Sequence, residues 1–213
     1  MVAAEHVPDV PDAQDVQDVP DVPPNAPPGT GTHNRAAWVA VAWGVLFAVP
    51  SFIWATGHTA GATSTVSPTL VAKVRDGETW FLVVLWLSGF LKLFASAVGV
   101  MLARPRGLRA GRFAVFCGAG AAVLLAGHGL LFVIGGALVE SGAVHGKPDV
   151  VGLLRWYLYL WGPYFFAGGV AFGMATLWYL RQTADRARIV RYAKVGAVGG
   201  ALAVLLSTLS GLG

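Results

Sequence analysis

Five long apolar stretches restrict the fold of this chain more than any other feature. Each holds about 20 residues or more, the length that an α-helix needs to cross a hydrocarbon core of about 30 Å. Only 12% of the 213 residues are charged, against about 25% in soluble domains. We therefore predict an all-α integral membrane protein, a bundle of five transmembrane helices. The predicted spans are 36–55, 79–103, 113–139, 151–180 and 192–212.

The first 34 residues differ from the rest of the chain. They repeat Val-Pro-Asp and contain no Lys or Arg. Proline blocks helix, neighbouring aspartates repel each other, and the few valines cannot form a core. We expect a disordered acidic tail over residues 1–34, followed by the membrane domain over 35–213. A solvated linker is the simpler interpretation of the tail, and partner binding is the alternative.

The basic residues predict an orientation. Segments 104–112 and 181–191 each hold four Arg, whereas 56–78 and 140–150 are nearly neutral. Since cytoplasmic loops carry the excess of Lys and Arg, the N-terminus is predicted in the cytoplasm and the C-terminus outside. The Ala, Gly, Val and Arg bias suggests a bacterial chain, and we expect it in the cell membrane. Orientation explains the basic pI of 9.5, so nucleic acid is not an expected partner.

Several classes of chemistry lack their motifs. The single cysteine, Cys117, rules out a disulfide within the chain. The sequence has no P-loop, no His-Glu-x-x-His and no Gly-x-Ser-x-Gly. It also lacks the Asp-rich pair that would hold Mg²⁺ against a diphosphate. We therefore expect no metal and no cofactor.

Of the five acids beyond the tail, all except Asp185 lie on the predicted outer side. Glu140 directly follows the apolar run of the third span. It either marks the end of that span or lies at the edge of a low-dielectric cavity, where desolvation would keep it protonated. A carboxylic acid in that state suits acid-initiated chemistry on an alkene. Glu140 is the leading catalytic candidate, with Asp149 and Glu78 as rivals.

Aromatic residues gather on the same side. Tyr157, Trp161 and Tyr164 follow i, i+4, i+7 spacing and share one helix face, as either an interfacial belt or a cavity wall. Ring faces could stabilise a carbocation. His128 lies in the middle of its predicted span. It either belongs to a functional site or forms a hydrogen bond with a carbonyl of a neighbouring helix. Lys92 lies mid-span without an evident partner. The predicted substrate-binding residues are Trp54, His58, His128, Tyr157, Trp161 and Tyr164.

Proline and glycine predict local irregularity and close packing. Pro50 predicts a kink in the first span, and Gly162–Pro163 a kink or break in the fourth. Gly-x-x-x-Gly patterns begin at Gly169 and Gly196 and offer faces for close helix packing. Such faces could also join copies of the chain into a homo-oligomer.

Two segments resemble a family of small bacterial membrane proteins of unknown function. They are WGVLFAVPSFIWATGHTAG (43–61) and LRWYLYLWGPYFFAGGVAFGMATLWYLR (154–181), and the resemblance spans about residues 36–182. That family usually has four spans, which implies that a fifth would be an addition here. The matching residues are Trp54, Gly57, Trp161, Pro163, Phe165, Gly168, Gly169, Tyr179 and Arg181.

The overall organisation also resembles the membrane-bound terpene cyclases of indole-sesquiterpenoid and meroterpenoid biosynthesis. Those enzymes protonate an alkene or epoxide with a carboxylic acid and need no metal. The resemblance implies a membrane enzyme that cyclises or isomerises a lipophilic isoprenoid, with membrane lipid and that small molecule as partners. The alternative is a non-enzymatic scaffold, a partner subunit or a small transporter.

Overall fold

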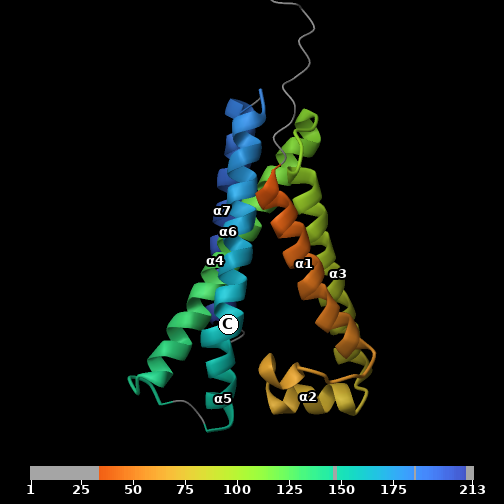
Figure 1. The fold of residues 1–213 in the computed structure, drawn as a ribbon, viewed down its shortest axis with the longest axis vertical. Helices are drawn as coiled ribbons and strands as arrows, with labels where there is room; N and C mark the ends of the chain where they lie inside the picture. Colours follow the sequence, from red (N-terminus) through yellow and green to blue (C-terminus); the bar gives the residue numbers. More distant parts are fainter. Residues whose placement is uncertain (1–33, 146–147, 185, 210–213) are drawn as a thin grey trace, which may run out of the picture. The chain divides into compact units, whose positions relative to one another are not determined.

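The computed structural model describes residues 34–145, 148–184 and 186–209, and within these residues it contains helices and no strand. The predicted acidic tail lies outside them except for Asn34. The helices are shown in Figure 1. They are α1 (Arg35–Ala55), α2 (Pro68–Arg75), α3 (Thr79–Leu102), α4 (Leu108–Glu140), α5 (Pro148–Trp156), α6 (Gly162–Gln182) and α7 (Arg186–Leu209).

Four of these helices, α1, α3, α4 and α7, are long and apolar enough to cross a membrane. The prediction of five spans is therefore corrected to four candidates. The predicted fourth span divides into α5, a π-helical turn over Tyr157–Trp161, and α6. Gly, Tyr, Trp and Thr residues lower the hydropathy of α6, and nine of its 21 residues are buried. A helix covered by its neighbours presents less apolar surface to lipid, which explains its weaker hydropathy.

The long helices form two groups. α1 packs along α3, and α4 packs against both α6 and α7. Glycines permit close approach: Gly44 of α1 lies against Ser96 of α3, and Gly120 of α4 lies against Gly196 of α7. Gly169 of α6 also faces α4. The two predicted Gly-x-x-x-Gly faces therefore begin with residues that pack within the chain.

One end of the domain, here called the basic end, is fastened by two buried polar residues. Asn34 caps α1, and its amide nitrogen donates to the carbonyls of Leu102 (3.0 Å) and Ala175 (3.1 Å). The Tyr179 hydroxyl accepts from the backbone N–H of Arg106 at 3.0 Å. Asn34 thus belongs to the folded domain, although its sequence context placed it in the tail. The described cations of this end are Arg35, Arg104, Arg106, Arg109, Arg112, Arg181, Arg186, Arg188, Arg191 and Lys194.

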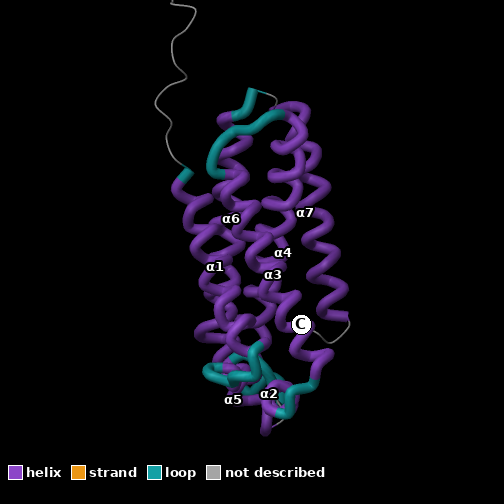
Figure 2. Tube along the Cα trace, turned by 90° about the vertical axis from the view of Figure 1, so that its right-hand side faces the viewer, coloured by secondary structure: helices purple, strands orange, loops and turns teal. Residues whose placement is uncertain are grey.

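The opposite end, here called the loop end, consists of residues 56–78, α5 and the π-helical turn. Figure 2 shows α2 and α5 together at this end of the helices. The break predicted near Gly162–Pro163 is the π-helical turn, and α6 begins directly after it. In contrast, α1 continues as one helix through Pro50.

Candidate functional site: two cavities separated by Lys92

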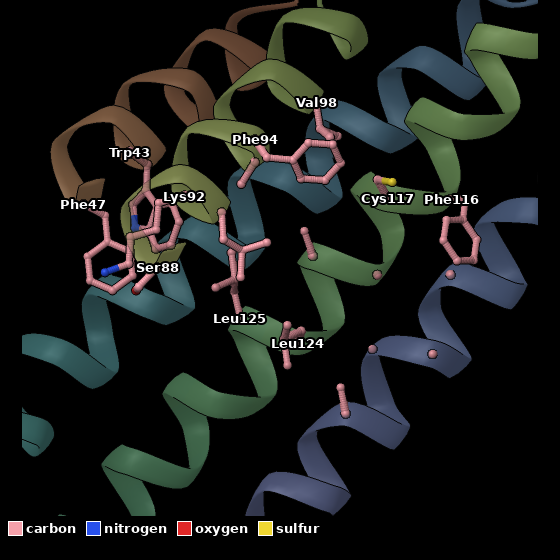
Figure 3. Close-up of a pocket in the computed structure, with 18 residues that line it drawn as sticks. Trp43, Phe47, Ser88, Lys92, Phe94, Val98, Phe116, Cys117, Leu124 and Leu125 are labelled. Atoms are coloured by element: carbon pink, nitrogen blue, oxygen red, sulfur yellow. The ribbon is translucent and has the colours of Figure 1, made fainter. Parts of the chain in front are cut away.

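A large apolar cavity lies between the two helix groups (Figure 3). Its volume is about 560 Å³, within the range of small-molecule sites. Lys92 is its only charged lining residue. α1 contributes two aromatic side chains, and α7 contributes mostly glycine. The lining residues are Trp43, Phe47, Ser88, Leu91, Lys92, Phe94, Ala95, Val98, Phe116, Cys117, Gly120, Ala121, Leu124, Leu125, Gly196, Gly199, Gly200 and Ala203.

The cavity opens sideways from the bundle. Leu91, Phe94 and Phe116 line it, yet 68%, 46% and 40% of their surfaces are exposed. Four of the helices are long and apolar enough to cross a membrane, so in a bilayer an opening between them would face hydrocarbon. A lipophilic molecule could therefore enter from the membrane without crossing water.

Lys92 forms the boundary between this cavity and a second one. Its ammonium donates to Ser51 Oγ at 2.6 Å and lies 3.8 Å from the centroid of the Phe47 ring. Ser51 is buried on α1, so the hydroxyl and the ring face supply a partner that the sequence did not reveal. Lys92 and Phe47 line both cavities.

The second cavity is small and aromatic, with a volume of about 100 Å³. Three of the predicted substrate-binding residues, Trp54, Tyr157 and Trp161, line it together. Their polar atoms all donate to backbone carbonyls of the loop after α1. Trp54 Nε1 reaches Ala60 O at 2.8 Å, and Trp161 Nε1 reaches Ser64 O at 2.7 Å.

The Tyr157 hydroxyl completes this set by donating to Thr65 O at 2.7 Å. The three aromatic residues therefore hold the loop over the small cavity. Tyr164, the fourth aromatic residue of the prediction, has a different partner. Its hydroxyl donates to Trp43 O at 3.0 Å, while Trp43 Nε1 donates to Tyr164 O at 2.8 Å. This reciprocal pair joins α6 to α1.

The two predicted histidines lie apart. The ring of His128 packs against Phe132 and Phe165, with centroids 4.4 and 5.5 Å away. Phe165 in turn packs on Phe47, so aromatic rings separate His128 from Lys92. His58 is exposed in the loop after α1, where its Nδ1 lies 3.2 Å from Thr56 Oγ1. No continuous polar track links His128 and Lys92 among the described residues.

The predicted catalytic acids that are described lie outside both cavities, in ion pairs. Glu140 accepts two hydrogen bonds from Arg155, at 2.9 and 3.2 Å. Glu78 pairs with Lys73 at 2.8 Å, and the hydrogen bond from Lys73 holds the pKa of Glu78 below its ordinary value. The side chain of Asp149 lies outside the described part of the structure.

Of the α1 residues at the site, the sequence prediction included Trp54 but missed Trp43, Phe47 and Ser51. Trp43, Phe47, Ser51 and Trp54 recur at spacings of four, four and three residues, which places them on one helix face. All four line a cavity or contact its boundary residue. That spacing was visible in the sequence, but its importance depends on α3 bringing Lys92 against the same face.

Fold and cavities together define a helical membrane protein with a laterally open apolar cavity. The sequence matches the family described as "Protein of unknown function (DUF3995)" over residues 44–172, which is more than half of the chain. The protein therefore belongs to this family. The matched region runs from α1 into α6 and leaves α7 outside. The predicted membership of a family of unknown function is confirmed, and the family description states no activity.

No curated protein and no solved structure matches the chain. The resemblance to membrane-bound terpene cyclases gains no support from these comparisons.

Proposed function

We propose that this protein is a membrane-embedded binding protein that holds the hydrocarbon chain of a lipophilic molecule in the large cavity. The observation that supports the proposal most is the cavity itself, apolar apart from Lys92 and Ser88, and bordered by exposed apolar side chains. Burying apolar surface in such a site is favourable mainly through close packing, because lipid already solvates the free ligand. Ligand shape should therefore matter more than ligand hydrophobicity.

Lys92 gives the cavity a point of polar specificity. Its ammonium has Ser51 Oγ and the Phe47 ring as neighbours, so an acceptor oxygen on a bound molecule would add a charge-assisted hydrogen bond. An intramembrane cation is a functional hypothesis by default. An oxygen that a ligand carries at mid-membrane depth would therefore bind Lys92; beside the hydrocarbon part of a ligand, Lys92 keeps Ser51 Oγ and the Phe47 ring as its partners.

The basic end is proposed to face the cytoplasm of a bacterial cell. Ten described Lys and Arg lie there, and the four acids of the described ranges, Asp76, Glu78, Glu140 and Asp149, belong to segments at the loop end or next to it, as the positive-inside rule requires. Labelling with a membrane-impermeant maleimide tests this directly. His145→Cys should react in intact cells, and Arg188→Cys should react only after lysis. The reverse pattern would overturn the orientation.

Photocrosslinking of the reconstituted full chain tests the binding function. The probe is a diacylglycerol with a diazirine in one acyl chain. The expected adducts lie on cavity residues such as Leu91, Leu124 and Ala203. Equal labelling of Leu87 and Leu177, which are exposed but outside the cavity, would indicate bulk lipid contact and contradict the proposal.

A matched pair of variants sharpens this experiment. Ala203 and Ala201 are both exposed on α7, but only Ala203 lines the cavity. Ala203→Phe should fill part of the cavity and remove most of the adduct on Leu124. Ala201→Phe should leave that adduct unchanged. If the two variants behave alike, the cavity is not the binding site.

Acid-catalysed cyclisation or isomerisation remains a prediction from the sequence. Glu140 and Glu78 are bound to cations outside the cavities, so the geometry favours binding over this chemistry. The variant Glu140→Gln distinguishes the enzymatic hypothesis from the binding function. If membranes that carry the native chain cyclise an isoprenoid and this variant does not, the enzymatic hypothesis is the better one.

A further inference from the structure

The faces of α4 and α7 that line the large cavity continue toward the basic end as a stripe of residues. On α4, Phe116 and Gly120 line the cavity at a spacing of four residues, and Arg112 is the next position of the same stripe. On α7, Gly196 lines the cavity, and Tyr192 lies one turn before it. The last apolar turn of the cavity is therefore followed by an arginine and a tyrosine on facing helices.

Two guanidinium groups flank that tyrosine. The Cζ atom of Arg112 lies 5.3 Å from the centroid of the Tyr192 ring, and the Cζ atom of Arg191 lies 5.1 Å from it. Neither arginine forms an ion pair among the described residues. Arg112 Nε is buried and has no hydrogen-bond partner there. A buried N–H without an acceptor is costly, and an oxyanion at this position would satisfy it.

The depth of the stripe corresponds to one leaflet. From Arg112 to Leu125, the last cavity residue of α4, thirteen residues at about 1.5 Å each give about 20 Å. Half of a bilayer core is about 15 Å, and the head group region begins beyond it. The guanidinium pair would therefore lie at head group depth, while Lys92 and Leu125 lie near the midplane.

We propose that the cavity binds an anionic phospholipid of the leaflet at the basic end. Its phosphate would bind Arg112 and Arg191, and one acyl chain would occupy the cavity between α3, α4 and α7. Guanidinium groups match phosphate oxygens in charge and geometry, and basic pockets between helices bind such head groups. This inference rests on the proposed function and adds the chemical class of the ligand.

Native mass spectrometry of the purified full chain tests the head group. Phosphatidylglycerol and diacylglycerol with identical acyl chains are compared as ligands. Phosphatidylglycerol should bind at least about tenfold more tightly, and the variant with Arg112→Gln and Arg191→Gln should lose most of this preference. A control with Arg186→Gln and Arg188→Gln removes the same charge from exposed positions at the same end and should keep it.

Other outcomes overturn the inference in distinguishable ways. If the control loses the preference equally, diffuse charge attracts the lipid and there is no site. If inorganic phosphate or glycerol phosphate displaces phosphatidylglycerol, the head group binds without the cavity. If both lipids bind equally and Ala203→Phe weakens both, the proposed function stands and the anionic class is wrong. If neither lipid binds, the proposed function fails as well.

Folding effects are controlled by single substitutions. Arg191 is exposed, so Arg191→Gln by itself should keep the fold and weaken phosphatidylglycerol binding several-fold. Arg112→Lys keeps the charge but removes the buried Nε–H, and it should also weaken binding. Full affinity in both variants would overturn the role of the guanidinium pair.

Discussion

The two cavities share a boundary but differ in how their polar groups are used. The small cavity, about 100 Å³, is lined by Trp54, Tyr157 and Trp161, whose polar atoms all bond to the loop after α1. The large cavity, about 560 Å³, has one charged group and opens toward lipid. The aromatic residues predicted from the sequence therefore hold the loop at one end of the domain, while small and aliphatic residues form most of the lining of the large cavity.

This difference shows that small residues, which leave space between helices, contribute as much to a ligand cavity as large side chains do. Gly120, Gly196 and Gly200 line the large cavity and also let α4 approach α7. Trp43 and Phe47 cover its α1 side. The site thus depends on packing between helices that are far apart in sequence. Three of the following predictions alter one cavity or the boundary between the two cavities, and the last one tests an ion pair of the loop end outside both.

Trp43→Ala should have the largest effect on stability. The side chain is 8% exposed, packs on the rings of Phe47 and Tyr164, and donates to Tyr164 O. Its removal should lower the free energy of unfolding by about 3–5 kcal/mol, measured by SDS titration in mixed micelles. Trp38→Ala, at a residue 50% exposed on the same helix, should cost under about 1 kcal/mol. Equal costs would mean that Trp43 does not join the helix groups.

Lys92→Met tests the boundary between the cavities. The substitution removes a charge at membrane depth and retains most of the side-chain length, so the free energy of unfolding should rise by about 1 kcal/mol. The same titration measures it. Lys194→Met, at an exposed residue of the basic end, should change stability by less than about 0.5 kcal/mol. A loss of stability in Lys92→Met would show that the contacts with Ser51 and Phe47 outweigh the cost of the charge.

Trp161→Phe tests the loop that covers the small cavity. The change keeps an aromatic ring and removes the hydrogen bond to Ser64 O, which should cost about 1 kcal/mol. Amide hydrogen exchange in residues 61–67 should accelerate, while crosslinking in the large cavity stays unchanged. Trp156→Phe, at an exposed neighbour, is the matched control. Equal exchange in both variants would contradict the anchoring role of Trp161.

Acid should produce the smallest effect, at the loop end. Lys73 lowers the pKa of Glu78 below the ordinary value of 4.5 through their hydrogen bond. The carboxylate therefore adds stability above that pH, and this contribution disappears as the pH falls through the lowered pKa. After correction for the intrinsic pH dependence of exchange, the protection of the α2 amides should fall between about pH 5 and about pH 3. Glu78→Gln should abolish this pH dependence, and its persistence would assign the effect to another group.

The sequence predicted most of the helices because hydropathy and length are local properties. The predicted spans over 36–55 and 79–103 agree with α1 and α3 to within one residue at each end. The prediction of the fourth span as a single helix was wrong, because this segment contains a π-helical turn and a helix, α6, that its neighbours cover. Three of the predicted aromatic residues, Trp54, Tyr157 and Trp161, line the small cavity, but their hydrogen bonds to the distant loop around Ser64 could not be inferred from spacing.

The sequence by itself determined that this protein is helical and suited to a membrane, because apolar length requires it, and it separated a basic end from a nearly neutral one. Only the tertiary structure decided which residues make the site. Lys92 gains Ser51 and Phe47 as neighbours, and Arg112 meets Tyr192, because α1 packs on α3 and α4 packs on α7. Those pairings depend on complementary surfaces between distant helices, which no local pattern in the chain records.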